Sequence, residues 1–109
     1  MAYYMTQFGY TADAWVSLAK KPEDRSKAVG SLIETFGGRL REMYYSFGEY
    51  DGLFIFEAPD AQSAAAVVVA AVGPGHVTKI LTTPLFTIQE AMEVMTKVGK
   101  VSYAAPSGK

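Results

Sequence analysis

Residues 39–58 contain two β-forming runs, Arg39 to Phe47 and Gly52 to Ala58, separated by the short segment Gly48-Glu49-Tyr50-Asp51. Glycine and aspartate suit a tight turn, so this pattern predicts an antiparallel hairpin. Successive side chains of a strand point to opposite faces. Counted by that alternation, Met43, Tyr45 and Phe47 share one face and Leu40 and Tyr44 the other, while Leu53 and Ile55 lie opposite Phe54 and Phe56. Both faces of the resulting sheet therefore need cover.

A strand and a helical region precede the hairpin. Ala2 to Tyr10 is rich in aromatic and β-compatible residues and leads into Thr11, a good N-cap, so a strand followed by a helix is expected. The helical pattern is interrupted at Lys20-Lys21-Pro22, because proline lacks a backbone donor and clashes with the preceding turn. It resumes as an apolar stripe and ends at Gly37-Gly38; the stripe consists of Ala28, Val29, Leu32, Ile33 and Phe36.

Two further helices and a strand follow the hairpin. Asp60 is placed to cap a helix that continues through Val72, and Gly73-Pro74-Gly75 ends it. His76 to Pro84 predicts the fourth strand. Thr87-Ile88-Gln89-Glu90 forms a capping box, and the helix behind it carries an apolar stripe of Ile88, Ala91, Met92, Met95 and Val98. We expect the methionines of this stripe to dock on a sheet edge or on a neighbouring subunit.

The predicted element order is βαββαβ with an extra C-terminal helix. This order predicts one α+β domain of ferredoxin-like type over residues 3–99, with both long helices on a single face of an antiparallel sheet. Residues 100–109 are expected to form a flexible tail.

Composition indicates a partner for the second face of that sheet. Half of the residues are apolar and 19% are charged, whereas about 25% charge is usual for soluble domains. A sheet with water on one side normally alternates apolar and polar side chains, and these strands do not. We therefore expect a homodimer in which two copies pack their sheets face to face, a dimeric α+β barrel, with higher assembly as a further option.

Several classes of function are disfavoured. The net charge of −1, with charges scattered along the chain, predicts no binding to nucleic acid or anionic lipid. No cysteine and a single histidine leave no familiar metal site, and no cofactor is expected. The N-terminus lacks a secretory signal, and the apolar run Ala64 to Val72 is far shorter than the ~20 residues of a membrane helix. We expect a cytoplasmic protein without a membrane partner.

Three short motifs carry a family resemblance. They are Phe47-Gly48-Glu49-Tyr50-Asp51, Glu57-Ala58-Pro59-Asp60 and Thr82-Thr83-Pro84. With these, the chain resembles the GYD domain family of small bacterial and archaeal proteins, over roughly residues 3 to 95. The resemblance implies a ferredoxin-like protomer in the dimeric α+β barrel superfamily. That superfamily includes cofactor-independent monooxygenases, muconolactone isomerase-like enzymes, haem-degrading enzymes and ligand-sensing modules, so fold likeness does not choose a function.

Four residues are candidates for proton transfer. Tyr50 and Asp51 place a phenol beside a carboxylate in the hairpin turn, although glycine and aspartate there are equally explained by the turn itself. His76 is the only histidine, the residue type best suited to acid–base work near neutral pH, but it stands alone at an expected exposed strand start. Tyr45 completes the set.

An aromatic group is the candidate binding site. Small-molecule clefts are mostly apolar, and we expect Phe8, Trp15, Tyr45 and Phe54 to line one, with Trp15 at its mouth. The competing interpretation is that these rings form packing core. Two functions stay open: a module that binds a small apolar ligand or a partner, which we favour, and a cofactor-independent monooxygenase- or isomerase-like enzyme acting on a small aromatic or enolisable substrate.

Overall fold

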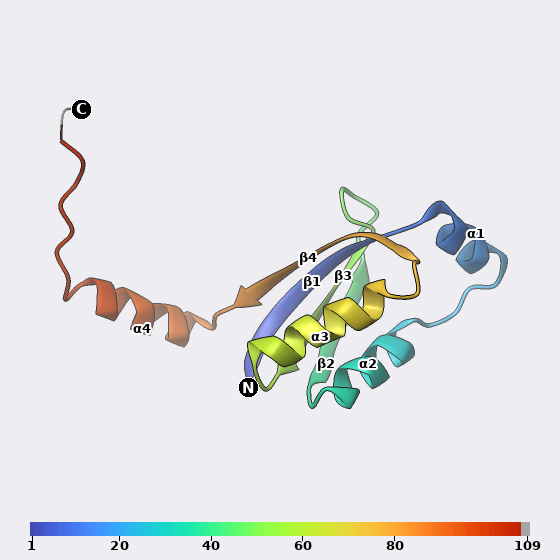
Figure 1. Cartoon of the computed structure of the whole chain (residues 1–109), viewed down its shortest axis with the longest axis horizontal. Helices are drawn as coiled ribbons and strands as arrows, with labels where there is room; N and C mark the ends of the chain where they lie inside the picture. Colours follow the sequence, from blue (N-terminus) through green and yellow to red (C-terminus); the bar gives the residue numbers. More distant parts are fainter. Residues whose placement is uncertain (108–109) are drawn as a thin grey trace.

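The structure, a computed structural model, describes residues 1–107, so residues 108 and 109 of the predicted tail lie outside the described part. The predicted order of elements is confirmed (Figure 1). The elements are β1 (Ala2–Tyr10), α1 (Ala12–Lys20), α2 (Ser26–Thr35), β2 (Arg39–Tyr45), β3 (Gly52–Ala58), α3 (Ala61–Val72), β4 (Val77–Leu85) and α4 (Ile88–Val98). Residues 101–107 contain neither helix nor strand.

The helix boundaries follow local hydrogen bonding. Thr11 caps α1 by accepting a bond from the Ala14 amide, and Asp60 caps α3 through the Ser63 amide. Thr87 and Glu90 form the complete capping box that begins α4. Gly37 ends the second helix with φ +83°, a conformation that glycine adopts without strain.

The four strands form one antiparallel sheet in the order β2-β3-β1-β4, and α2 and α3 lie together on one of its faces (Figure 1). The core between helices and sheet is apolar, and half of its buried members are aromatic. Its buried members are Tyr4, Phe8, Ile33, Phe54, Phe56, Ala58, Ala64 and Val67. Thr6 is buried among them, and its hydroxyl pairs with that of Thr82 at 2.8 Å, so this polar group has a partner.

A register shift in β2 corrects one expectation from the sequence. Simple alternation put Leu40 and Met43 on opposite faces. In the structure Leu40 pairs with Phe56 and Met43 with Phe54, and all four lie on the helix-covered face. The extra residue of a β-bulge between Leu40 and Glu42 causes the change, because it inverts the alternation beyond it.

The other face of the sheet carries no described helix. The strand register places on this open face Tyr3, Met5, Gln7, Arg39, Glu42, Tyr44, Leu53, Ile55, Glu57, Lys79, Leu81, Thr83 and Leu85. Tyr44 is 55% exposed and Leu81 46%, while Met5, Leu53 and Ile55 are half-buried. An apolar strip therefore crosses the middle of the sheet.

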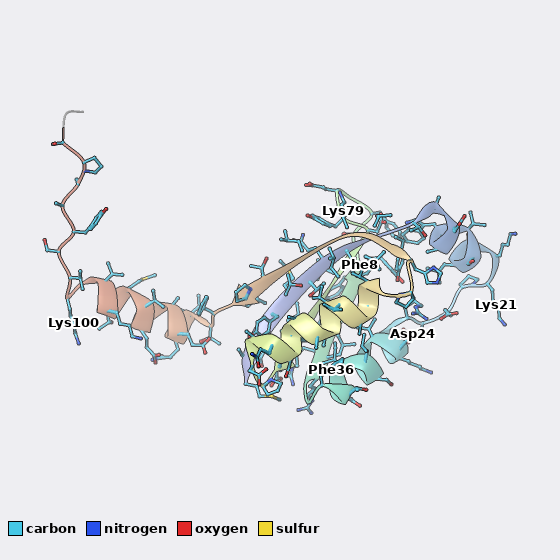
Figure 2. All side chains as sticks on the ribbon, in the orientation of Figure 1. Phe8, Lys21, Asp24, Phe36, Lys79 and Lys100 are labelled. Carbon is cyan, nitrogen blue, oxygen red and sulfur yellow. The ribbon has the colours of Figure 1, made fainter. Side chains whose placement is uncertain are left out.

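The last helix stands apart from the rest of the chain. α4 continues outward from the end of β4, and its side chains meet no side chains of the sheet or of the other helices (Figures 1 and 2). None of its residues is buried. The radius of gyration of 17.9 Å exceeds the roughly 13 Å expected for a compact chain of this length. No described helix combines the length and hydropathy needed to cross a membrane.

Candidate functional site

A cleft of about 350 Å³ opens between α2, α3 and the helix-covered face of the sheet. Its floor comes from the sheet, with Phe8, Phe54, Met43 and Ile80. Its walls come from Ala28, Val29 and Leu32 of α2 and from Ala70 and Ala71 of α3, and it closes at Pro74 and Val77. The small alanine side chains leave the space between the helices that larger residues would fill. The result is an apolar hollow.

Three polar side chains, Tyr10, Arg25 and His76, line this cleft where β1 ends and β4 begins. They also line a second hollow, beside α1, so they stand between the two spaces. The backbone fixes the position of the histidine, because its carbonyl accepts a hydrogen bond of 2.9 Å from the Thr11 amide. His76 itself is exposed, which leaves its ring accessible to solutes.

The charge and protonation of the other two groups follow from their neighbours. The Arg25 guanidinium bonds to the Glu23 carboxylate at 2.7 Å, which raises the pKa of Arg25 and keeps it cationic. Nη1 of Arg25 makes that contact, and the neighbouring Tyr10 side chain makes a smaller contribution to the raised pKa of Arg25. Burial, and then the hydrogen bond with Tyr45, raises the pKa of Tyr10 well above its usual range. Tyr10 therefore offers a hydroxyl rather than a phenolate at neutral pH.

A cluster of rings adjoins the polar mouth of the cleft. The Tyr10 and Tyr45 hydroxyls lie 3.2 Å apart, and Trp15 packs edge-on against Tyr10 with ring centroids 5.1 Å apart. Phe47 stacks on Tyr45 at 5.9 Å and is 73% exposed. Its backbone has φ +52°, an unusual conformation for a bulky residue. The loop between β2 and β3 thus holds an exposed aromatic side chain beside the mouth.

Asp51 ties this loop to the end of β1. Its Oδ2 accepts hydrogen bonds from the Tyr10 amide at 2.8 Å and from Trp15 Nε1 at 3.1 Å. Its own amide donates to the Phe8 carbonyl at 2.8 Å. The carboxylate is thus bonded to a backbone amide and an indole of the same chain, so the geometry gives Asp51 a role in positioning Tyr10 and Trp15 beside the cleft.

The four candidates for proton transfer do not meet in one space. His76 alone lines the cleft. Tyr45 does not line the cleft but contacts two residues that do, Tyr10 through the hydroxyl groups and Phe8 through an edge-on ring contact. Asp51 is held by the two bonds described above. Tyr50 lies elsewhere, with the Lys79 ammonium 4.7 Å from the centre of its ring.

The four candidates for ligand binding divide evenly. Phe8 and Phe54 line the floor of the cleft, whereas Trp15 and Tyr45 belong to the adjoining ring cluster. Sequence reasoning missed Tyr10, Arg25 and Met43. Tyr10 ends a strand and Arg25 immediately precedes α2, so their signal was only their place at an element boundary, where functional side chains often lie.

Electrostatics and composition limit what the site can hold. The described residues contain no group of three or more histidine or acidic side chains able to hold a metal ion. The cleft instead combines an apolar floor with one cation and two hydrogen-bonding groups at one end. This arrangement suits a small ligand with an apolar body and an acceptor or anionic group.

Comparisons with known proteins bear on the fold. A family model described as the GYD domain matches residues 4–95. The solved structure of MtbAldR superposes with a TM-score of 0.56 at 14% identity, over 79% of this chain and 52% of the other. TTHA0845 from Thermus thermophilus gives a TM-score of 0.52 at 18% identity, over 80% and 95%. This chain thus spans about half the length of MtbAldR. No curated protein matches the sequence. At these identities the structural likenesses show a shared fold.

Proposed function

The chain belongs to the GYD domain family, and from that premise we propose that it is a binding module for a small molecule seated between α2, α3 and the sheet. The observation that carries the proposal is the cleft itself. Its volume of about 350 Å³ lies within the range of about 300–1,000 Å³ typical of small-molecule sites. Its polar groups are gathered at one end, as ligand orientation requires.

The lining defines the chemical class of the ligand. Phe8 and Phe54, with ring centroids 6.0 Å apart, offer apolar surface to a ring or a branched alkyl group. Arg25 offers guanidinium donors, and protonated Tyr10 offers a hydroxyl. A carboxylate at the mouth would accept from both, and charge-assisted bonds of this kind are the strong ones. We infer a small monocarboxylate or similar anion with an apolar body.

The anionic dye anilinonaphthalene sulfonate has this combination of rings and charge, and it is the probe for the test. In the wild type we expect phenylacetate to displace part of the dye and to lower its fluorescence. Ala71→Phe fills the cleft and should abolish this displaceable fluorescence. Gln62→Phe adds the same ring elsewhere on α3 and should leave the displaceable fluorescence unchanged. Arg25→Gln should weaken phenylacetate binding about tenfold, since a bond to a charged group contributes about 1.5–3 kcal/mol. Lys21→Gln, in the same α1–α2 link, is its control. Displacement that is unchanged in both cleft variants refutes the proposal.

An enzyme of the monooxygenase or isomerase type is less well supported. Acid–base chemistry needs its groups within hydrogen-bond reach of one substrate. Of His76, Tyr50, Asp51 and Tyr45, one lines the cleft, and Asp51 is engaged with backbone and indole donors.

Assembly is the second part of the proposal. We infer that two copies pack their open sheet faces together, because Leu81, Ile55 and Met5 form an apolar strip that no described helix covers. Leu81→Lys, at a position already 46% exposed, is combined with Val69→Glu, which removes the exposed apolar contact surface on α3, and the mass measured by sedimentation equilibrium should then fall to that of a monomer. Ser31→Lys, on the exposed side of α2, should not change it. A wild-type protein that sediments as a monomer contradicts this inference.

A further inference from the structure

In the described part of the chain, α4 and α3 each present an apolar surface that belongs neither to the core, nor to the cleft, nor to the open face. The first is on α4, where the stripe predicted from the sequence is exposed. Ile88 is 79% exposed, Met92 56%, and Met95 and Val98 each 66%. The spacing of Ile88, Met92 and Met95 places them on one side of the helix. The polar residues Glu90, Glu93 and Lys97 occupy the other side by the same spacing.

The second surface is the outer side of α3. This helix reads AQSAAAVVVAAV and is apolar on nearly every side, a pattern typical of helices that are covered all round. Its inner side, with Ala64 and Val67, is buried against the sheet. Its outer side is not, since Val69 is 71% exposed and Val72 36%.

An apolar groove runs beside that outer side, between α3 and the edge strand β4. We call it the α3–β4 groove; its volume is about 370 Å³, and it is lined by Tyr4, Ala61, Ala64, Ala65, Val68, Val69, Ile80, Thr82 and Pro84. The alanines of α3 let another helix approach closely, while the methionines of α4 are long and adaptable. The two elements also match in length, with 12 residues in α3 and 11 in α4.

We propose that α4 of one copy of this chain lies in the α3–β4 groove of a second copy, which places its own α4 in the first copy in the same way. A helix of fewer than about 12–15 residues is marginal in water without tertiary packing. α4 has 11 residues and no buried side chain, so its capping box alone does not account for a stable helix. A docking surface outside its own domain does.

The geometry at the end of β4 favours a second copy over the same chain. Only Phe86 and Thr87 separate β4 from α4, and Thr87 has the extended angles φ −65° and ψ 163°. The chain therefore continues away from its own groove (Figure 1). Reciprocal exchange also doubles the buried area, which brings two short helices toward the roughly 1,200 Å² of a stable interface. The proposal uses none of the cleft residues Tyr10, Arg25 and His76, so it stands independently of the proposed ligand.

Cysteine cross-linking tests this arrangement directly, because the natural chain has no cysteine. One chain carries Val69→Cys. A second chain carries Met92→Cys and an affinity tag that gives it a different mass. The two chains are co-expressed, purified together and mildly oxidised. We expect a disulfide between the two chains, identified by mass spectrometry. In the control pair Met92→Cys is replaced by Glu93→Cys, on the polar side of α4, and the yield should be at least about tenfold lower.

Three outcomes would overturn the proposal: no disulfide between the chains, equal yields from the two pairs, or a disulfide within a single chain when both cysteines are placed in it. Amide hydrogen exchange gives a second readout that needs no oxidation. We expect Val69→Glu, at an exposed position, to raise the exchange rates over residues 91–98 at least about tenfold while the sheet stays protected. Unchanged exchange in α4 also overturns it.

Discussion

Replacing Asp51 with alanine removes the link between the β2–β3 loop and the start of α1. The carboxylate accepts from the Tyr10 amide and from Trp15 Nε1, which lie 41 and 36 residues away in sequence. Alanine leaves both donors without that acceptor. Because Tyr10 lines the cleft and Trp15 packs against it, loss of the carboxylate should loosen the mouth as well as lower the free energy of unfolding.

The expected magnitude follows from the two bonds. A hydrogen bond to a charged group contributes about 1.5–3 kcal/mol, but Asp51 is only half-buried and water can replace part of each. We expect Asp51→Ala to cost about 2–3 kcal/mol and to lower Tm by roughly 8–12 °C for a domain of this size. Asp51→Asn keeps an acceptor oxygen and should cost about half as much. Trp15→Phe should cost about 1 kcal/mol less in the alanine background than in the wild type, because its partner is already gone.

Urea denaturation followed by far-UV circular dichroism measures these values without depending on Trp15. Glu49→Ala is the matched control, since Glu49 is exposed in the same loop, and it should stay within about 0.5 kcal/mol of the wild type. The reasoning is refuted if Asp51→Ala falls within that same margin. It is refuted equally if Trp15→Phe costs as much with the carboxylate absent as with it present.

Three further predictions concern other parts of the chain. The pKa of Tyr10 is raised in the folded state from its ordinary 10.0, so above about pH 10 the unfolded chain ionises first and the free energy of unfolding should fall. Tyr10→Phe should reduce that fall in urea titrations from about pH 8 to 11. Gly38→Ala should lower the free energy of unfolding by more than about 2 kcal/mol, because the added Cβ meets the Glu57 carbonyl oxygen. Gly48→Ala, with open space around it, should lower it by less than about 1 kcal/mol in the same denaturation assay. Thr87→Ala breaks the capping box and should speed amide exchange in the first turn of α4 without changing the Tm of the sheet domain.

Local signals were sufficient to predict the order of the elements. The caps at Thr11, Asp60 and Thr87 and the stop at Gly37-Gly38 set the element boundaries, and each depends on hydrogen bonds within a few residues. The assignment of faces in β2 was wrong at Leu40, because a bulge adds one residue to the count and leaves no mark in the sequence that separates it from a regular strand. The β2–β3 loop also begins two residues earlier than predicted, so Phe47 lies outside the strand.

The site was harder to predict, because the cleft forms only where distant elements meet. Phe8 and Phe54 could be found from aromatic content and strand alternation. Arg25 could not, since its place at the mouth depends on how the chain returns from α1 to α2 after Pro22. The place of Asp51 beside a tyrosine makes it a candidate for proton transfer in the sequence. The bonds that engage it come from Tyr10 and Trp15, 41 and 36 residues away, and have no local signature.

The position of α3 explains how so small a chain presents two apolar hollows. Ala70 and Ala71 at one end of the helix line the cleft, while Ala61, Ala65 and Val69 line the groove on its outer side. Larger side chains on this helix would fill both spaces, and charged ones would place an unpaired charge against apolar surface in each. In keeping with these demands, α3 contains no charged residue. In the sequence, the excess of apolar residues looks like surplus core. In the structure, these residues lie in the cleft, in the groove, on α4 and on the open face of the sheet. These are the surfaces where a ligand or a second copy would bind.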